Sequence, residues 1–380
     1  MTTTLSPHPQ LALDTILHKP AKGIPSWLIH VMEHDFIERL AGAQPGDYLK
    51  RPEETYLAFQ RAIGTCLLDQ FIPENPLSMG SHGFVGADHG PTTGAAETVC
   101  DGILINSAEA VVQHMESAAF PALRAAIASF DESARLKQII EKESAIQGKL
   151  GPDILKGPYG FIAFPHFAYG TYGYHHYFAA YALYPDVIER HFSLQADLAL
   201  LNNGAAARAF AQANFPPLYR LDHDMADSRG TLVNVATLDR LWFPHFARAL
   251  RPLLNANVRL IWHCDGNLMQ MVPRLLDVGL KGFQGFQYEA GMDYERICRM
   301  KTNDGEPLTI IAGVSVTRTL PMGSPQDVKR EMAWLVENGP KTGLFLGCTS
   351  SITPGVPWEN IKTLVEGLQY YREHGRQGVH

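Results

Sequence analysis

Short apolar stretches alternate with longer amphipathic segments along most of the chain. Each apolar stretch is four to eight residues long and ends near Gly, Pro, Asn or Asp, which is typical of a buried strand. Eight of these stretches are predicted as strands, at residues 24–30, 66–73, 159–165, 218–224, 258–263, 282–287, 308–313 and 343–347. Helices are predicted from residue 51, over 107–147 with Ser107 as N-cap, and over 174–210, 238–253, 268–278, 294–302, 325–338 and 358–373.

This strand–helix repetition indicates a parallel sheet covered by helices. Eight units predict a (β/α)8 TIM-type barrel forming one domain over residues 1–380, and an open doubly wound sheet is the alternative. Residues 1–23 are expected to form an N-terminal arm. Residues 74–157 are expected to be an insertion after the second strand, consisting of a Gly- and His-rich loop followed by helices.

Composition narrows the class of function. The 380 residues carry a net charge of −7 without a basic run, so nucleic acid is not expected as a partner. No leader-like segment and no membrane-length apolar run is present, and the five cysteines have no CxxC spacing. These features favour a cytoplasmic protein that acts on a small molecule away from membranes. No GxxxxGK[ST] or GxGxxG motif supports nucleotide binding.

Potential metal ligands follow several of the predicted strands. Strand 218–224 ends in Asp-His-Asp, with Asp224 last, and strand 258–263 ends in His263 and continues to Asp265. The next strand leads to Glu289, and the eighth leads to Cys348. The carboxyl ends of barrel strands form the active-site face, so these N, O and S donors could converge on one zinc ion. Each also has a structural interpretation, as a helix cap, a surface ion pair or a buried thiol.

The same stretches resemble the uroporphyrinogen decarboxylase superfamily. The similarity covers roughly residues 155–370 and is carried by segments 224–230 (DMADSRG), 263–267 (HCDGN), 288–293 (YEAGMD), 311–313 (IAG) and 347–360 (GCTSSITPGVPWEN). It implies a barrel and suggests a homodimer. The decarboxylases of this superfamily hold the carboxylates of a tetrapyrrole with an arginine-rich segment near the N-terminus. Residues 27–35 (WLIHVMEHD) contain no arginine, so tetrapyrrole decarboxylation is disfavoured.

The other branch of the superfamily comprises zinc-dependent methyl- and alkyltransferases that act on corrinoid-bound methyl groups or thiols. The resemblance implies a zinc site formed by His263, Asp265, Glu289 and Cys348, with Glu289 as the ligand that substrate displaces. Asp265 stands where that branch has a cysteine, which makes the donor set harder. Cys264 should face away from His263, because side chains alternate along a strand.

The sequence thus predicts a zinc-dependent methyltransferase or alkyltransferase that uses a corrinoid as substrate or on a partner protein. Asp224 and Glu289 are the candidate catalytic residues, and His89, His166 and Tyr169 are candidate substrate contacts. Two alternatives stay open: a metal-free decarboxylase or lyase of a small acid, and a non-catalytic ligand-binding barrel.

Overall fold

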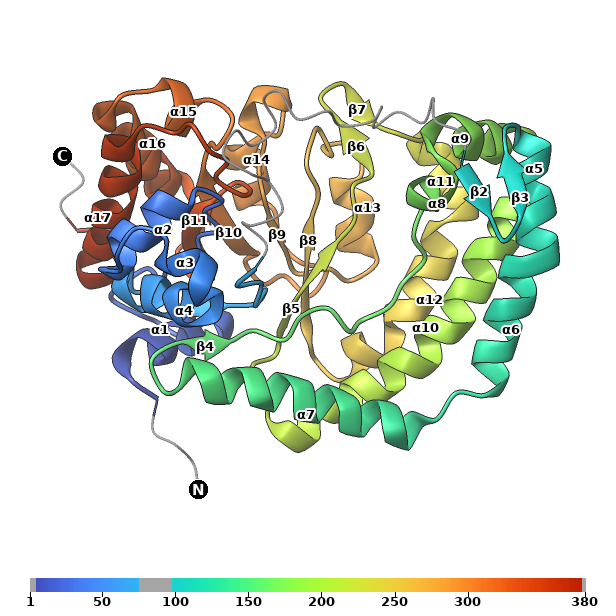
Figure 1. The fold of residues 1–380 in the computed structure, drawn as a ribbon, viewed down its shortest axis with the longest axis horizontal. Helices are drawn as coiled ribbons and strands as arrows, with labels where there is room; N and C mark the ends of the chain where they lie inside the picture. Colours follow the sequence, from blue (N-terminus) through green and yellow to red (C-terminus); the bar gives the residue numbers. More distant parts are fainter. Residues whose placement is uncertain (1–4, 75–97, 378–380) are drawn as a thin grey trace.

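The centre of the molecule is a parallel five-stranded sheet with the strand order β11-β10-β9-β8-β5 (Figure 1). The computed structural model describes residues 5–74 and 98–377. The strands are β5 (Leu218–Asp222), β8 (Arg259–His263), β9 (Gly282–Gln284), β10 (Thr309–Val314) and β11 (Leu344–Cys348). Nearly all of their residues are buried, as expected for a parallel sheet that is covered on both faces.

Further parallel pairing extends the sheet beyond β11. Ser26 bridges Leu346, Trp27 bridges Leu67, and β1 (Leu67–Leu68) pairs with β4 (Leu155–Lys156), all in parallel orientation. Within the described ranges no strand ladder joins β4 to β5, although the Tyr219 hydroxyl, on β5, accepts hydrogen bonds from two main-chain N–H groups at residues 161 and 162. The result is a mixed α/β fold with a parallel sheet, consistent with the predicted barrel.

Three predicted strands differ from the observed ones. Residues 24–30 form no strand ladder and pair only through single bridges at Ser26 and Trp27. The second shrinks to the two residues of β1, and residues 159–165 form no strand, since the paired segment in that part of the chain is the earlier β4. Pro158 and Pro165 lack the N–H group that a ladder needs, and Gly160 has a φ of +80°. These residues interrupt the apolar run that favoured a strand.

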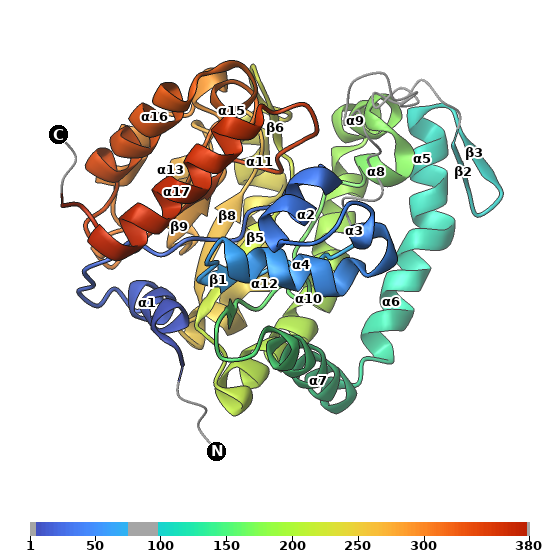
Figure 2. The same ribbon diagram turned by 60° about the vertical axis from the view of Figure 1, so that its left-hand side comes forward.

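Helices form the outer layer of the fold (Figures 1 and 2). α16 (Pro325–Asn338) and α17 (Trp358–His374) pack together beside β10, whereas α10 (Pro185–Ala213) and α12 (Phe243–Asn255) pack together toward the β5 end. The shorter helices after β4 are α8 (Tyr169–Tyr172), α9 (Tyr174–Leu183), α11 (Val235–Leu241), α13 (Val272–Asp277), α14 (Tyr294–Arg299) and α15 (Thr319–Met322), with a 3-10 turn at Tyr288–Ala290 and a hairpin of β6 (Ala226–Asp227) and β7 (Gly230–Thr231). No helix in the described ranges has the combination of length and apolar character needed to cross a membrane.

The N-terminal part adds helices around β1 and β4. They are α1 (Pro7–Ile16), α2 (His34–Ala41), α3 (Asp47–Lys50) and α4 (Pro52–Ala62). The described part of the insertion contains the hairpin β2 (Thr98–Cys100) and β3 (Ile103–Ile105), then α5 (Ala108–His114), a π-helix (Met115–Ala119), α6 (Phe120–Ala128) and α7 (Glu132–Leu150). Ser107 caps α5 as predicted, and the helical region expected over 107–147 is divided at Asp131, whose side chain caps α7.

An aromatic cluster fixes β8 against the helix layer. The fully buried ring of Trp262 packs against Trp242 and Phe246, with centroid separations of 6.1 Å and 5.4 Å. Trp262 therefore faces the helices, and its neighbour His263, which points the opposite way along the strand, faces the inner side of the sheet. This alternation determines which side chains reach the candidate site.

Candidate metal centre

Three potential metal ligands meet at the carboxyl ends of β5 and β8. They are Asp222, Asp224 and His263, whose ligand atoms all lie within 4.8 Å of one another. Asp222 and His263 are register partners at the ends of adjacent parallel strands, so their side chains emerge on the same face. Two of the three, Asp224 and His263, stand among the predicted site residues, and Asp265 lies beside them.

The spacing within the group suits ligands that share an ion. The Nε2 atom of His263 lies 4.0 Å from Oδ1 of Asp222 and 3.9 Å from Oδ1 of Asp265, too far for a hydrogen bond. Two ligands on one tetrahedral zinc ion lie about 3.4 Å apart, and opposite ligands of an octahedral ion about 4.2 Å apart. Oδ1 of Asp265 is also buried without a hydrogen-bond partner in the described structure. A divalent cation fits this donor set.

Asp222 is oriented by hydrogen bonds to one of its two oxygens. Its Oδ2 accepts from Arg220 Nη1 at 2.8 Å and from the Tyr159 hydroxyl at 3.0 Å, which leaves Oδ1 directed toward His263. Burial alone would raise the pKa of Asp222, but the charges of His263 and Arg220 and these two hydrogen bonds hold it below its ordinary value. Asp222 is therefore an ionised, fixed carboxylate.

Arg220 is itself fixed from the interior of the sheet. Its Nε donates to Asp69 at 2.7 Å, and its guanidinium lies over the rings of Trp27 and Tyr159. The arginine is 4% exposed. Side chains that hold a metal ligand by hydrogen bonds, as Arg220 holds Asp222, usually determine the orientation of that ligand.

The surroundings of Asp265 raise its pKa, whereas those of Asp222 lower the pKa of that carboxyl group. Burial and the negative charges of Asp224, Asp222 and Glu289 raise its pKa, and the charge of His263 offsets only part of this effect. Its main-chain N–H donates to Oδ1 of Asp224 at 3.2 Å. Three carboxyl groups thus surround one imidazole, and either a bound cation or a proton relieves their repulsion.

The imidazole of His263 depends on a glycine on the neighbouring strand segment. Gly285 has a φ of +74°, and a Cβ atom there would lie 2.5 Å from Nδ1 of His263. Both the backbone conformation and the close approach require glycine. The Gly-Phe-Gln-Gly-Phe-Gln repeat at 282–287 therefore serves the site as well as the sheet.

Cys348 lies on the other face of the sheet. The register aligns His263 with Gln284, Gln284 with Ile311, and Ile311 with Phe345. Phe345 therefore shares the face of His263, and Cys348, three residues further along β11, has the opposite parity. Burial and the charge of Glu331, on α16, raise the pKa of its thiol, which agrees with a position toward the helix layer. The structure does not bring Cys348 into the cluster.

Glu289 lies in the 3-10 turn that follows β9. Its Oε1 accepts hydrogen bonds from the hydroxyl groups of Ser315 and Thr317, the former at 3.1 Å. Its charge contributes to the raised pKa of Asp265, but it is not part of the three-residue ligand group. Glu289 is thus near the site and bound to the loop after β10.

The predicted substrate contacts have separate positions. The Tyr169 hydroxyl donates to the main-chain oxygen of Asp224 at 2.9 Å, which places Tyr169 beside the cluster. The imidazole of His166 packs against that of His223 at 4.7 Å and its Nδ1 lies 2.7 Å from the oxygen of Phe164. His89 lies outside the described residues.

Sequence reasoning missed the residues that support the ligands. Asp69, Tyr159 and Arg220 were not among the predicted site residues, and Asp222 was noted only as part of a strand end. One signal was available, because Arg220 is a charge inside the apolar stretch Leu-Tyr-Arg-Leu. A buried arginine needs a buried partner, so its presence indicates a carboxylate nearby.

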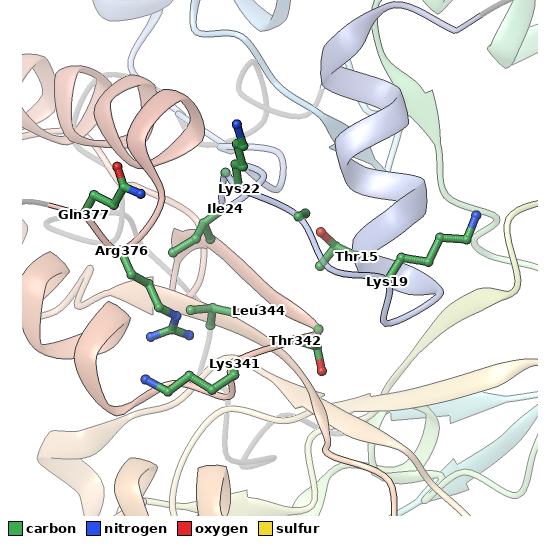
Figure 3. A pocket seen from close by; sticks show the side chains of 12 residues that line it. Thr15, Lys19, Lys22, Ile24, Lys341, Thr342, Leu344, Arg376 and Gln377 are labelled. Atoms are coloured by element: carbon green, nitrogen blue, oxygen red, sulfur yellow. The ribbon is translucent and has the colours of Figure 1, made fainter.

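A pocket at the opposite end of the sheet is a weaker candidate for a ligand site than the cluster of Asp222, Asp224 and His263. It is lined by Lys19, Lys22, Lys341 and Arg376 near the amino ends of β11 and of the segment that starts at Ile24. Figure 3 shows these cationic side chains pointing in different directions. Lys19 pairs with Asp14, and Arg376 donates to main-chain oxygens after α16. The charges do not converge on one ligand.

Comparisons with known proteins agree with the resemblance seen in the sequence. The model of the family described as Uroporphyrinogen decarboxylase (URO-D) matches residues 223–371, a span that begins at the cluster. The fold is similar to that of a methyltransferase from Methanosarcina mazei, with a TM-score of 0.58 and 15% identity over 97% of this chain and 99% of that chain. No curated protein sequence matches. Residues 223–371 of this chain are therefore similar to the URO-D family, and the remainder of the chain lies outside that match.

Proposed function

We propose that this protein is a metal-dependent methyltransferase or alkyltransferase whose cation is held by Asp222, Asp224 and His263. The observation that carries the proposal is the convergence of these ligand atoms within 4.8 Å at the carboxyl edge of the sheet. The match to the URO-D family and the fold shared with a methyltransferase support the reaction class. The proposal includes a closed (β/α)8 barrel, in which this edge is the active-site face.

The residues around the cation site would have two roles, since some would bind the cation and another would hold a proton. A bound divalent cation would supply Lewis-acid activation of a substrate atom. Arg220 and Tyr159 hold Asp222 in its binding orientation. Asp265, whose pKa is raised, would hold a proton near the substrate or serve as a further ligand. Tyr169 borders the site beside Asp224.

The identity of the cation, the methyl carrier and the oligomeric state are also proposed. Zinc is the cation that the family resemblance implies, and the imidazole and carboxylate donors are compatible with it. A corrinoid, free or on a partner protein, is the proposed methyl carrier. A homodimer is the proposed assembly.

Metal analysis combined with a methyl-transfer assay tests this function. Purified protein should hold about one divalent cation per chain and should move methyl groups between methylcobalamin and a panel of acceptors. His263→Ala and Asp222→Asn should lose both properties, while Glu337→Gln, at an exposed position on α16, should keep both. A protein that binds no divalent cation contradicts the proposal.

The raised pKa of Asp265 favours a second candidate, a metal-free decarboxylase or lyase. A carboxyl group whose pKa is raised holds its proton more readily and can donate it to a carbanion left by decarboxylation. Turnover of a carboxylic acid that persists after chelation of all metal, and is lost in Asp265→Asn, would select this reaction over transfer.

A further inference from the structure

We infer that the cation site contains no cysteine ligand and that the substrate atom reaching the cation is an oxygen rather than a sulfur. This inference rests on the cation site of the proposed function and deepens it. It departs from the ligand set that the family resemblance implies, in which Cys348 is a metal ligand.

Cys264 follows β8 and Cys348 ends β11, and both side chains face away from the cluster. Cys348 has the parity opposite to that of His263 across four paired strands. Cys264 directly follows His263 and so points to the other side; its sulfur accepts the main-chain N–H of Met225 at 3.2 Å. Both residues are buried, at 1% and 3% exposure, so neither can swing into the site without rearranging the core.

The other three cysteines lie on elements away from the carboxyl edge. Cys66 directly precedes β1, at its amino end, and its sulfur contacts the main-chain oxygen of Gly64. Cys100 lies in the β2–β3 hairpin, and Cys298 lies on α14. In the described ranges, which include all five cysteines, the ligand group contains only oxygen and nitrogen donors.

The remaining donors determine which substrate atom fits. Carboxylates are hard ligands, and a site built from them and an imidazole suits Mn²⁺, Mg²⁺, Fe²⁺ or Zn²⁺ without the soft thiolates that favour sulfur chemistry. The carboxylates of Asp222 and Asp224 already balance the charge of one divalent ion, and Asp265 adds a third carboxyl group beside them. Arg220, the cation beside them, is already paired with Asp69 and Asp222.

A thiolate entering this site would add negative charge beside carboxylates that already balance the charge of the cation. A neutral oxygen of an alcohol, ether or carbonyl adds none. The site therefore favours an oxygen-bound methyl or alkyl group, or a hydroxyl acceptor, as the partner of the cation.

Cobalt(II) substitution tests the inference with a readout that does not depend on activity. Co²⁺ bound to thiolate gives an intense sulfur-to-metal charge-transfer band in the near ultraviolet, which oxygen and nitrogen ligands do not give. The full-length protein titrated with Co²⁺ should show visible ligand-field bands without the sulfur band. Cys348→Ser and Cys264→Ser should change cobalt affinity less than about twofold, whereas Asp222→Asn and Asp224→Asn should lower it at least tenfold.

The outcomes separate this inference from the function on which it rests. A sulfur-to-cobalt band in the wild-type protein, lost in either serine variant, would overturn the inference and leave a metal-dependent transferase intact. Failure of the wild-type protein to bind cobalt at all would overturn both. For the substrate atom, ethanol added to the cobalt protein should shift the ligand-field bands, and ethanethiol at the same concentration should not create a sulfur band. A sulfur band with ethanethiol would contradict the preference for oxygen.

Discussion

Replacement of Arg220 by methionine tests the electrostatic network beneath the cation site. The side chain is buried and donates to Asp69 at 2.7 Å and to Asp222 at 2.8 Å. Methionine keeps much of the apolar volume and removes the charge and every donor. Asp69, whose side chain is 7% exposed, then becomes a buried carboxylate without its ion-pair partner, whereas Asp222, at 34%, keeps access to water.

The expected loss in the free energy of unfolding depends on which carboxylate loses its positively charged partner. Removing one member of a buried ion pair typically destabilises a protein by about 3–5 kcal/mol, and most of this cost should come from Asp69. Arg220→Met combined with Asp69→Asn removes the stranded charge. The double variant should therefore be more stable than Arg220→Met alone, with a coupling energy of about 2 kcal/mol or more.

Equilibrium urea unfolding of the four proteins of this double-mutant cycle measures the effect. Arg229→Met is the matched control, because Arg229 also pairs with an aspartate, Asp227, but is 89% exposed, so its loss should cost much less stability than the loss of Arg220. If Arg220→Met cost no more than this control, or if the two substitutions in the cycle were simply additive, the buried pair would not have the role assigned to it.

Three further predictions address the site glycine, the core and pH. Gly285→Ala should weaken cation binding at least tenfold, because the added Cβ would displace His263. Gly305→Ala is the control, since Gly305 also has a positive φ but has open space around it, and it should leave binding unchanged. Calorimetric titration with Zn²⁺ compares the two variants, and an equal loss of affinity would refute the steric explanation. Trp262→Ala should cost about 3–5 kcal/mol in urea unfolding, since a fully buried ring leaves a cavity, and a cost below 1 kcal/mol would mean that β8 is not held by this cluster. Burial lowers the pKa of His191 to about 4 from 6.5, so the unfolded chain binds more protons between these values and stability falls as pH drops from 6.5 to 4. This contribution reaches about 3 kcal/mol at most, and thermal unfolding of His191→Gln across that range should show a shallower pH dependence than wild type; an unchanged slope would contradict the buried neutral imidazole.

The sequence predicted the parallel α/β organisation because its strongest signals are local. Apolar runs ending in turn residues identify the five strands of the central sheet, and Ser107 identifies the start of α5. Residues 159–165 show where the same signal fails. The apolar pattern is present, but prolines and a glycine at positive φ prevent a ladder.

The sequence predicted only some of the residues that lie at the candidate site, and the reason is geometric. His263, Asp224 and Asp265 follow adjacent strands, so their proximity follows from strand order alone. Whether Cys348 joins them depends on the register of three successive strand pairs, which no single stretch of sequence contains. The pair formed by Asp69 and Arg220 spans 151 residues, and only the folded sheet brings it together.

The most direct test of the central claim is anomalous X-ray diffraction from crystals of the full-length protein loaded with Zn²⁺. One strong anomalous peak is expected within bonding distance of His263 Nε2 and of carboxylate oxygens of Asp222 and Asp224. A peak bonded to the sulfur of Cys348, or no peak among these three side chains at full zinc loading, would contradict that claim.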